Sequence, residues 1–314
     1  MTTTIPTTRK TGIQAGRSPA RAKRDDRPER ADRDPGAKVV RVKRPPEAQA
    51  CPVILASPHS GREYDAELSA STRLSVDLLR RSEDAYVDQL IDFAPEYGAT
   101  LVCAEFPRVF VDVNRAAGEV DPGMFADRIP VGEIAPSRRA LSGLGVIPHI
   151  GAEGRTLYRR RMRFAEARAR LERYYHPYHG ALQAEMARLK ARFGCAVLVD
   201  MHSMPASSAG GADIVLGDRF GTSCNGLVTE RMETILRELG FVTVRNNPYA
   251  GGYTTEHYGR PPDAVHAIQV EINRALYMDE NRVTLTTDHT RLITKIRSFV
   301  SELTGIDWSQ SLQS

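Results

Sequence analysis

Cysteine is scarce in this chain of 314 residues, which contains only four, at positions 51, 103, 195 and 224. None of them forms a CxxC pair, so the sequence offers neither a cysteine-based zinc site nor the dense disulfide framework of small secreted proteins. Cys103 and Cys195 lie inside apolar runs, where free thiols behave as small buried hydrophobic groups. We interpret all four as reduced thiols of a cytoplasmic protein.

The sequence also lacks an uninterrupted apolar stretch of about 20 residues, the length that a membrane-spanning helix requires. No apolar core of a signal peptide follows Met1. We therefore expect a soluble protein with no membrane partner. The glycines at 210–211 and within 217–221 do not have the spacing of a phosphate-binding loop, which argues against a nucleotide site.

The formal net charge of +4 is concentrated at one end of the chain. Residues 1–44 contain 13 Lys and Arg against 5 Asp and Glu, whereas the remainder has a slight acidic excess of 34 against 30. The globular part therefore lacks the basic patch that nucleic acid binding requires. Residues 1–37 contain almost no large apolar side chain, so we predict a disordered basic tail there and one domain over 38–314.

Beyond the tail, short apolar runs alternate with segments of helical spacing. Continuous apolar runs of this length are typical of strands that are buried on both faces of a largely parallel sheet. The pattern predicts a three-layer α/β domain with a mostly parallel or mixed sheet, whose ligands bind beyond the carboxyl ends of the strands. The predicted strands are 52–57, 99–106, 109–113, 195–201, 213–216, 241–245 and 267–272, and the predicted helices are 83–96, a long one within 155–193, 226–239 and 287–303.

Two histidines, His59 and His202, follow predicted strands directly and can meet at one edge of the sheet. Catalytic zinc often binds two histidines and one carboxylate and keeps a position for water. Glu63, Glu83 and Asp84 compete for the third position, and we favour Asp84 because the first turn of a helix stabilises an ionised carboxylate. The alternative for each histidine alone is an ordinary hydrogen-bonded loop residue.

Other polar residues end the neighbouring strands. Asn114 and Arg115 suit a substrate carboxylate, because a guanidinium group binds a carboxylate through two parallel hydrogen bonds, although a surface ion pair and a turn would explain them equally well. Glu271 lies in an apolar strand, where burial raises the pKa of a carboxyl group towards that of a general base. The competing interpretation of Glu271 is a structural salt bridge with Arg274 or Arg115.

Two further segments contain histidine. Residues 251–259 form a polar stretch bounded by glycines, which we predict to be a loop over the ligand with Thr255 and His257 as substrate contacts, although an ordinary connection would explain it equally well. His176 and His179 lie three positions apart in a segment of helical spacing, and we interpret them as surface or packing residues rather than ligands.

Six segments together resemble the N-formylglutamate amidohydrolase family, and the similarity spans about residues 45–305. They are SPHSG at 57–61, SED at 82–84, FVDVNR at 110–115, VDMHS at 199–203, GGYTTEHYG at 251–259 and QVEINRALYMDE at 269–280. The resemblance implies a phosphorylase/hydrolase-like fold related to zinc carboxypeptidases, a bound divalent metal, and hydrolysis of N-formyl-L-glutamate to formate and L-glutamate in histidine degradation. The chain departs from the carboxypeptidase pattern at Arg62, where an acidic ligand would stand.

The resulting hypothesis is a small-molecule hydrolase of the cytoplasm. His59, His202 and Asp84 hold a divalent metal, most simply Zn²⁺, and Glu271 acts as the general base. Asn114 and Arg115 bind a substrate carboxylate, and Arg274 serves a second carboxylate or the oxyanion. The alternatives are a deacylase or carboxypeptidase for another N-acyl amino acid or acidic peptide, and a non-catalytic adaptor that acts through the basic tail. The sequence does not predict an oligomeric state.

Overall fold

The computed structural model describes residues 1–2 and 39–312. The predicted disordered tail at 1–37 therefore lies outside the described residues, apart from its first two positions. The chain divides into two units, Met1–Ala37 and Lys38–Ser314, and the fold below is that of the second unit. Within the described residues, no helix combines the length and apolar character needed to span a membrane.

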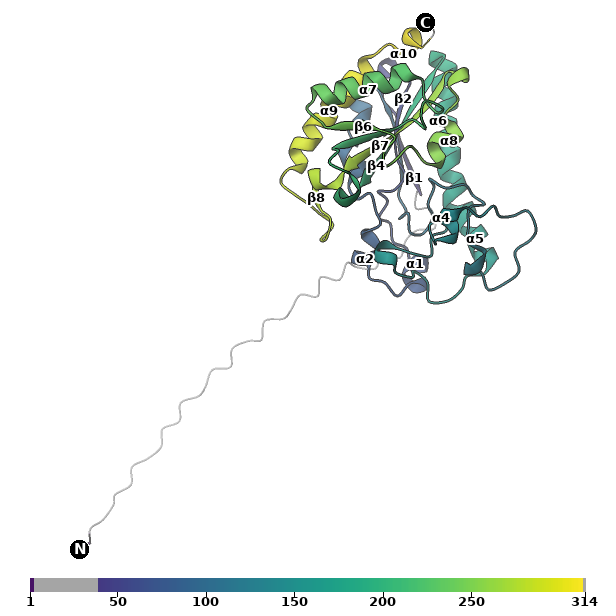
Figure 1. Ribbon diagram of the computed structural model, residues 1–314, viewed down its shortest axis with the longest axis vertical. Coiled ribbons are helices and arrows are strands. Elements are labelled where there is room, and N and C mark those ends of the chain that lie inside the picture. The colour runs from purple at the N-terminus through teal and green to yellow at the C-terminus, as the bar shows by residue number, and fades with distance from the viewer. Residues whose placement is uncertain (3–38, 313–314) are drawn as a thin grey trace. The chain divides into compact units, whose positions relative to one another are not determined.

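A mixed sheet of seven strands forms the centre of the domain, in the order β1-β3-β2-β4-β7-β5-β6 (Figure 1). The four central strands β3, β2, β4 and β7 are parallel, whereas β1 pairs antiparallel with β3 and β5 pairs antiparallel with β7. The strands are β1 Val40–Lys43, β2 Val53–Ser57, β3 Thr100–Ala104, β4 Ala196–Met204, β5 Ile214–Gly217, β6 Thr243–Arg245 and β7 Val265–Asn273, with a separate pair formed by β8 Met278–Asp279 and β9 Thr284–Leu285.

Helices cover both faces of this sheet, as the alternation of side chains along each strand requires. Val53 and Leu55 of β2 pack in the cluster that contains α7 and α9, whereas Ile54 of the same strand packs in the cluster that contains α6. Figure 1 shows α7 and α9 on one side of the strands and α6 on the other. These three layers confirm the predicted α/β architecture.

The helices range from single turns to one of eighteen residues. The predicted long helix within 155–193 is interrupted by a π-helical turn at Leu171–Tyr175, between α5 and α6. The helices are α1 Ala66–Ser71, α2 Val76–Arg80, α3 Val87–Leu90, α4 Arg138–Leu141, α5 Phe164–Arg170, α6 His176–Phe193, α7 Gly226–Glu238, α8 Tyr253–Tyr258, α9 His289–Gly305 and α10 Trp308–Ser311.

Unequal strand lengths create the edge at which the polar residues gather. β2 ends at Ser57, because Pro58 follows and has no N–H group for the ladder. β4 pairs with β2 only as far as Asp200, but it pairs with β7 along all nine of its residues. The last residues of β4, including His202, therefore extend beyond the end of β2, next to the loop that contains His59.

Three predicted elements were wrong. Residues 109–113 form no strand, because Phe110 N–H closes a turn onto the Pro107 carbonyl (2.9 Å), and Phe110 and Val111 are buried against α6 and its neighbours. An apolar run thus marked burial rather than a β-ladder. The predicted helix at 83–96 shrinks to α3 and a 3₁₀ turn, since Tyr86 has a φ of 68°, which an α-helix cannot accommodate.

The segment 251–259 is also not the predicted loop. Residues Tyr253–Tyr258 form helix α8, in which Thr254 and Thr255 are fully buried. Gly252 begins this helix with its backbone amide hydrogen-bonded to the Gln269 side chain (2.8 Å). A Cβ atom at Gly252 would overlap the Asn114 side chain, so this glycine allows a close approach to Asn114 rather than a mobile cover.

Candidate active site

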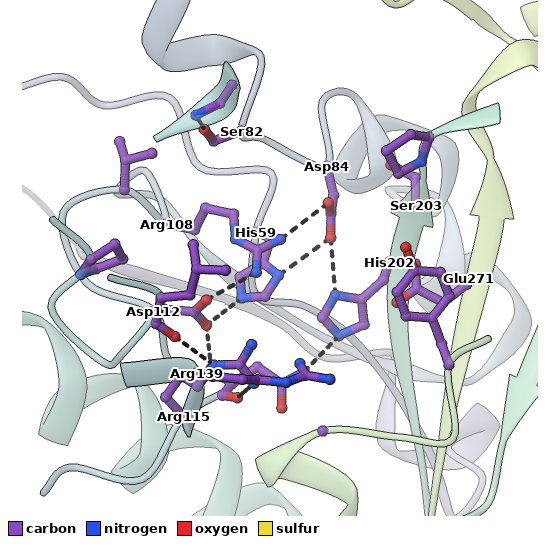
Figure 2. A pocket seen from close by; sticks show the side chains of 18 of the residues that line it. His59, Ser82, Asp84, Arg108, Asp112, Arg115, Arg139, His202, Ser203 and Glu271 are labelled. Carbon is purple, nitrogen blue, oxygen red and sulfur yellow. Dashed lines mark hydrogen bonds and ion pairs between the residues drawn. The ribbon is translucent and has the colours of Figure 1, made fainter. Parts of the chain in front are cut away.

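His59 and His202 meet at the carboxyl edge of the central strands, as predicted. Their ring centroids lie 4.8 Å apart, and both side chains are buried. Asp84 joins them, and one ligand atom from each of the three residues lies within 4.8 Å of the other two. Figure 2 shows the three side chains turned towards one another.

The two rings are held in the same manner. The Nδ1 atoms of His59 and His202 lie 3.3 and 2.9 Å from the same Asp84 oxygen, Oδ2. Their Nε2 atoms lie 2.8 Å from Asp112 Oδ1 and 2.9 Å from Asp200 Oδ2, respectively. If each neutral ring donates its Nε2–H to its own outer carboxylate, both Nδ1 lone pairs point at the Asp84 carboxylate. A cation between these three atoms resolves the repulsion, and carboxylates behind histidine ligands are the usual support of a zinc site.

The charges of the group favour the same interpretation. Burial alone would raise the pKa of Asp84, but hydrogen bonds with His202 and His59 and the nearby Arg108 charge hold it well below its usual value. Burial alone would lower the pKa of His202, whereas the Asp200 and Asp84 carboxylates raise it well above its usual value. The carboxylates thus stabilise positive charge at the imidazole rings, and this charge can come from protons or from a metal ion that competes with them.

Asp84 reaches the histidines for a different reason from the one we predicted. No helix begins at this residue; instead, the Asp84 backbone N–H donates to the His59 carbonyl (3.0 Å), and the Ser60 hydroxyl donates to the Asp84 carbonyl (3.1 Å). The other candidates, Glu63 and Glu83, lie outside the metal-ligand group. Glu83 instead accepts a hydrogen bond from the Tyr64 hydroxyl (2.5 Å).

Glu271 lies on β7, directly opposite His202 in the parallel ladder. Burial raises the pKa of Glu271 to about 7, since the nearby His202 lowers it only in part and the Asp84 charge raises it further. Its Oε1 accepts a hydrogen bond from Gln269 Nε2 at 2.7 Å. A buried carboxyl group with such a pKa, opposite His202, has the properties of a general base.

A cavity of about 600 Å³ opens over these residues and has the size of a small-molecule site. Asn114 and Arg115 line it, as predicted. Asn114 Oδ1 accepts the Thr254 backbone N–H at 2.8 Å, and its Nδ2 lies 3.4 Å from His202 Nε2. The Arg115 guanidinium donates to two carbonyl oxygens, those of Leu144 and Asn114, both at 3.1 Å.

The structure does not bring every predicted contact to this cavity. Arg274 lines it, but its Nη2 donates to Asp84 Oδ1 (2.9 Å) and its Nε donates to the Ser203 hydroxyl (3.1 Å). Thr255 and His257 do not line it: the Thr255 hydroxyl donates to the Gly252 carbonyl, and His257 is exposed and stacks on Tyr253.

The residues that support the candidate ligands were not predicted from the sequence. Asp112 and Asp200 stand in segments that were already singled out, and Asp200 lies two positions before His202 on the same face of its strand. That spacing was an available signal. Arg108, which donates to Asp112 Oδ2 at 2.9 Å, was missed because residues 109–113 were predicted as a strand, whereas Pro107 begins a turn there.

A second missed group holds the Asn114–Arg115 segment from behind. The Tyr175 hydroxyl donates to the Arg115 carbonyl (2.9 Å), and His179 Nε2 lies 2.9 Å from the Val113 carbonyl. Burial lowers the pKa of His179 to about 4, so the ring is neutral, and its Nδ1 lies 2.8 Å from the Tyr258 hydroxyl. The interpretation of His179 as a surface or packing residue was therefore incomplete, because it positions the backbone of the site.

Comparisons with known proteins cover most of the chain. The profile of a family described as N-formylglutamate amidohydrolase matches residues 51–278. The chain is 35% identical over 241 residues to an N-formylglutamate deformylase of Pseudomonas aeruginosa, covering 73% of this chain and 83% of that protein. For the N-formylglutamate deformylase of Pseudomonas putida, the identity is 33% over 240 residues, covering 73% and 82%.

Solved structures extend the comparison. The crystal structure of an N-formylglutamate amidohydrolase from Ralstonia eutropha matches with a TM-score of 0.80 and 32% identity, covering 87% of this chain and 98% of that one. A gene product of Agrobacterium tumefaciens matches with a TM-score of 0.57 and 20% identity, covering 84% and 94%, and shares the fold. The profile match includes the three candidate metal ligands and Glu271.

Proposed function

Since the chain belongs to the N-formylglutamate amidohydrolase family, we propose that it hydrolyses the amide bond of N-formyl-L-glutamate, or of a related N-acyl amino acid, with a divalent metal. The products would be formate and L-glutamate. The proposal includes a role in histidine degradation and a location in the cytoplasm. The observation that carries it is the convergence of two imidazole nitrogens and one carboxylate oxygen beside Glu271.

His59, His202 and Asp84 would hold the metal, with Asp112 and Asp200 orienting the two rings. When bound, a cation such as Zn²⁺ polarises a carbonyl oxygen and lowers the pKa of water towards neutrality. The other steps belong to the protein's own side chains. Arg274 and Arg108 already offset the charge of the buried Asp84 carboxylate, and a cation bound there would add to this effect.

Glu271 takes a proton from the attacking water and returns it to the departing amine. Its pKa of about 7 lets it both accept and release that proton near neutral pH. Asn114 and Arg115 orient the substrate by binding its α-carboxylate at the wall of the cavity. Arg274, which hydrogen-bonds Asp84 and Ser203, would stabilise the oxyanion that forms from the amide carbonyl.

Metal removal tests the proposal most directly. The full-length protein is dialysed against a chelator, its metal content is measured, and formate release from N-formyl-L-glutamate is assayed before and after Zn²⁺ is restored. We expect activity to fall with the metal content and to return with the cation. Undiminished formate release from metal-free protein would contradict the proposal.

The competing activity is hydrolysis of other N-acyl amino acids or of acidic peptides. A panel of N-formyl, N-acetyl and larger N-acyl derivatives of glutamate separates the two, because a pocket shaped for a formyl group rejects larger acyl groups sterically.

The adaptor hypothesis is tested by deleting residues 1–37. Retained hydrolysis supports the enzyme, whereas loss of a salt-sensitive nucleic acid interaction alone supports the adaptor.

A further inference from the structure

The cavity contains more arginine than its acidic residues neutralise. Two buried histidines, four acidic side chains and five arginines line it. The acidic residues are Asp84, Asp112, Glu153 and Glu271, and the arginines are Arg81, Arg108, Arg115, Arg139 and Arg274. The pairing of these charges shows which arginines remain for a ligand.

Three of the arginines are already paired with acids of the same wall. Arg274 donates to Asp84 (2.9 Å), Arg108 donates to Asp112 (2.9 Å), and Arg81 pairs with Glu153. Arg115 and Arg139 are different. Among the residues that the structure describes, no acidic side chain forms an ion pair with Arg115, and the Arg139 side chain has neither an ion pair nor a hydrogen bond.

Arg115 and Arg139 belong to one structural unit. Arg115 Nε donates to the Leu144 carbonyl (3.1 Å), and Leu144 N–H donates to the Arg139 carbonyl (2.9 Å). The Ser137 hydroxyl accepts the Ala140 N–H (3.1 Å) at the start of α4. The segment that carries Arg139 is therefore anchored beside Arg115, and both residues are labelled in Figure 2.

We propose that Arg139 binds the second carboxylate of a dicarboxylic N-acyl amino acid whose first carboxylate is bound by Arg115. The inference rests on the proposed function and assigns the residue that selects acidic substrates. A carboxylate that leaves water needs a charged partner, and a guanidinium group supplies two parallel hydrogen bonds to it. Arg274, which sequence alone suggested for this role, is held by Asp84 and Ser203.

The test compares two substrates that differ by one charge, N-formyl-L-glutamate and N-formyl-L-glutamine. For Arg139→Met, we expect the ratio of their kcat/KM values to fall about tenfold, between the few-fold effect of an exposed ion pair and the roughly hundredfold effect of a buried charged hydrogen bond. Arg139→Lys should recover part of the ratio. Arg138→Met is the matched control, because Arg138 is exposed on the same helix and does not line the cavity.

Product binding gives a second measurement that does not depend on turnover. Calorimetric titration of the holoenzyme with L-glutamate should show weaker binding for Arg139→Met and unchanged binding for Arg138→Met. An unchanged substrate ratio, or an equal loss for both substrates, overturns the inference and leaves the proposed function intact. If the wild-type protein releases formate from neither compound, the proposed function fails and this inference fails with it.

Discussion

Replacement of Glu271 by glutamine isolates the proton transfer from the rest of the reaction. The variant keeps the shape of the side chain and can still meet Gln269, but it cannot accept a proton from water. General-base catalysis contributes roughly 10²- to 10⁴-fold to a rate, so we expect kcat to fall by that factor while KM changes little. Metal content should stay the same, because Glu271 is outside the ligand group.

The pH dependence of kcat/KM in the wild-type enzyme tests the ionisation of Glu271. Without a cation, burial raises the pKa of Glu271 to about 7, and only the ionised form can accept a proton, so kcat/KM should rise with pH up to this region. Between pH 6 and 7.5, the ionised fraction increases roughly eightfold for such a pKa. A bound cation would move the inflection to lower pH, because positive charge favours the carboxylate.

Steady-state formate release, measured from pH 5 to 9 for both proteins, checks this reasoning. The matched control is Glu256→Gln, since Glu256 is an exposed carboxylate that pairs with Arg219 and does not line the cavity. The reasoning is refuted if Glu271→Gln keeps more than about a tenth of the wild-type kcat. If Glu271→Gln had a normal metal content and still showed the rise of kcat/KM with pH, that rise would belong to another group.

Three other perturbations test the supporting structure. Asp200→Asn should weaken zinc binding about 10- to 100-fold, because it loosens the orientation of His202; a zinc titration with a competing chelator measures this, and unchanged affinity would contradict the role of Asp200. Tyr175→Phe removes the hydrogen bond to the Arg115 carbonyl and should raise KM about fivefold with a smaller change in kcat, whereas a loss of stability alone would leave KM unchanged. Burial lowers the pKa of His266 to about 4, below its unfolded value near 6.5, so the stability that depends on its neutral form is complete above pH 6.5 and is lost as pH falls towards 4. Urea unfolding should show a free energy of unfolding that is about 2 kcal/mol lower at pH 4.5 than at pH 7.5, and this difference should be smaller in His266→Gln. An equal difference in the variant would assign the acid sensitivity to other groups.

Sequence alone located the part of the site that is encoded by strand ends. His59 and His202 each follow an apolar run, and parallel strands bring such residues to one edge, so their meeting needed no knowledge of side-chain packing. The α/β fold and the resemblance to the family were confirmed for the same reason: both depend on local patterns. Glu271 also came from a local pattern, an acidic residue within an apolar strand.

The remaining features depend on contacts between distant segments, which no local pattern reports. Asp84 was chosen for a helix dipole, yet a hydrogen bond to the His59 carbonyl places it. The run at 109–113 has the composition of a strand, but Pro107 starts a turn and the apolar side chains are buried without a ladder. The role proposed for Arg139 had no signal in the sequence, because it rests on the absence of an ion pair among the described residues.

The extension of β4 past β2 places the residues proposed for hydrolysis on the sheet and leaves those proposed for substrate selection outside it. His202 and Glu271 are fixed by the backbone ladder that joins β4 to β7, whereas Arg115 stands on a bend and Arg139 on the short helix α4, both outside the sheet. Segments of the second kind tolerate exchange far better than paired strands do. We therefore expect that new acyl amino acid preferences can be engineered by replacing the turns around 116–144 while the hydrolytic apparatus stays untouched.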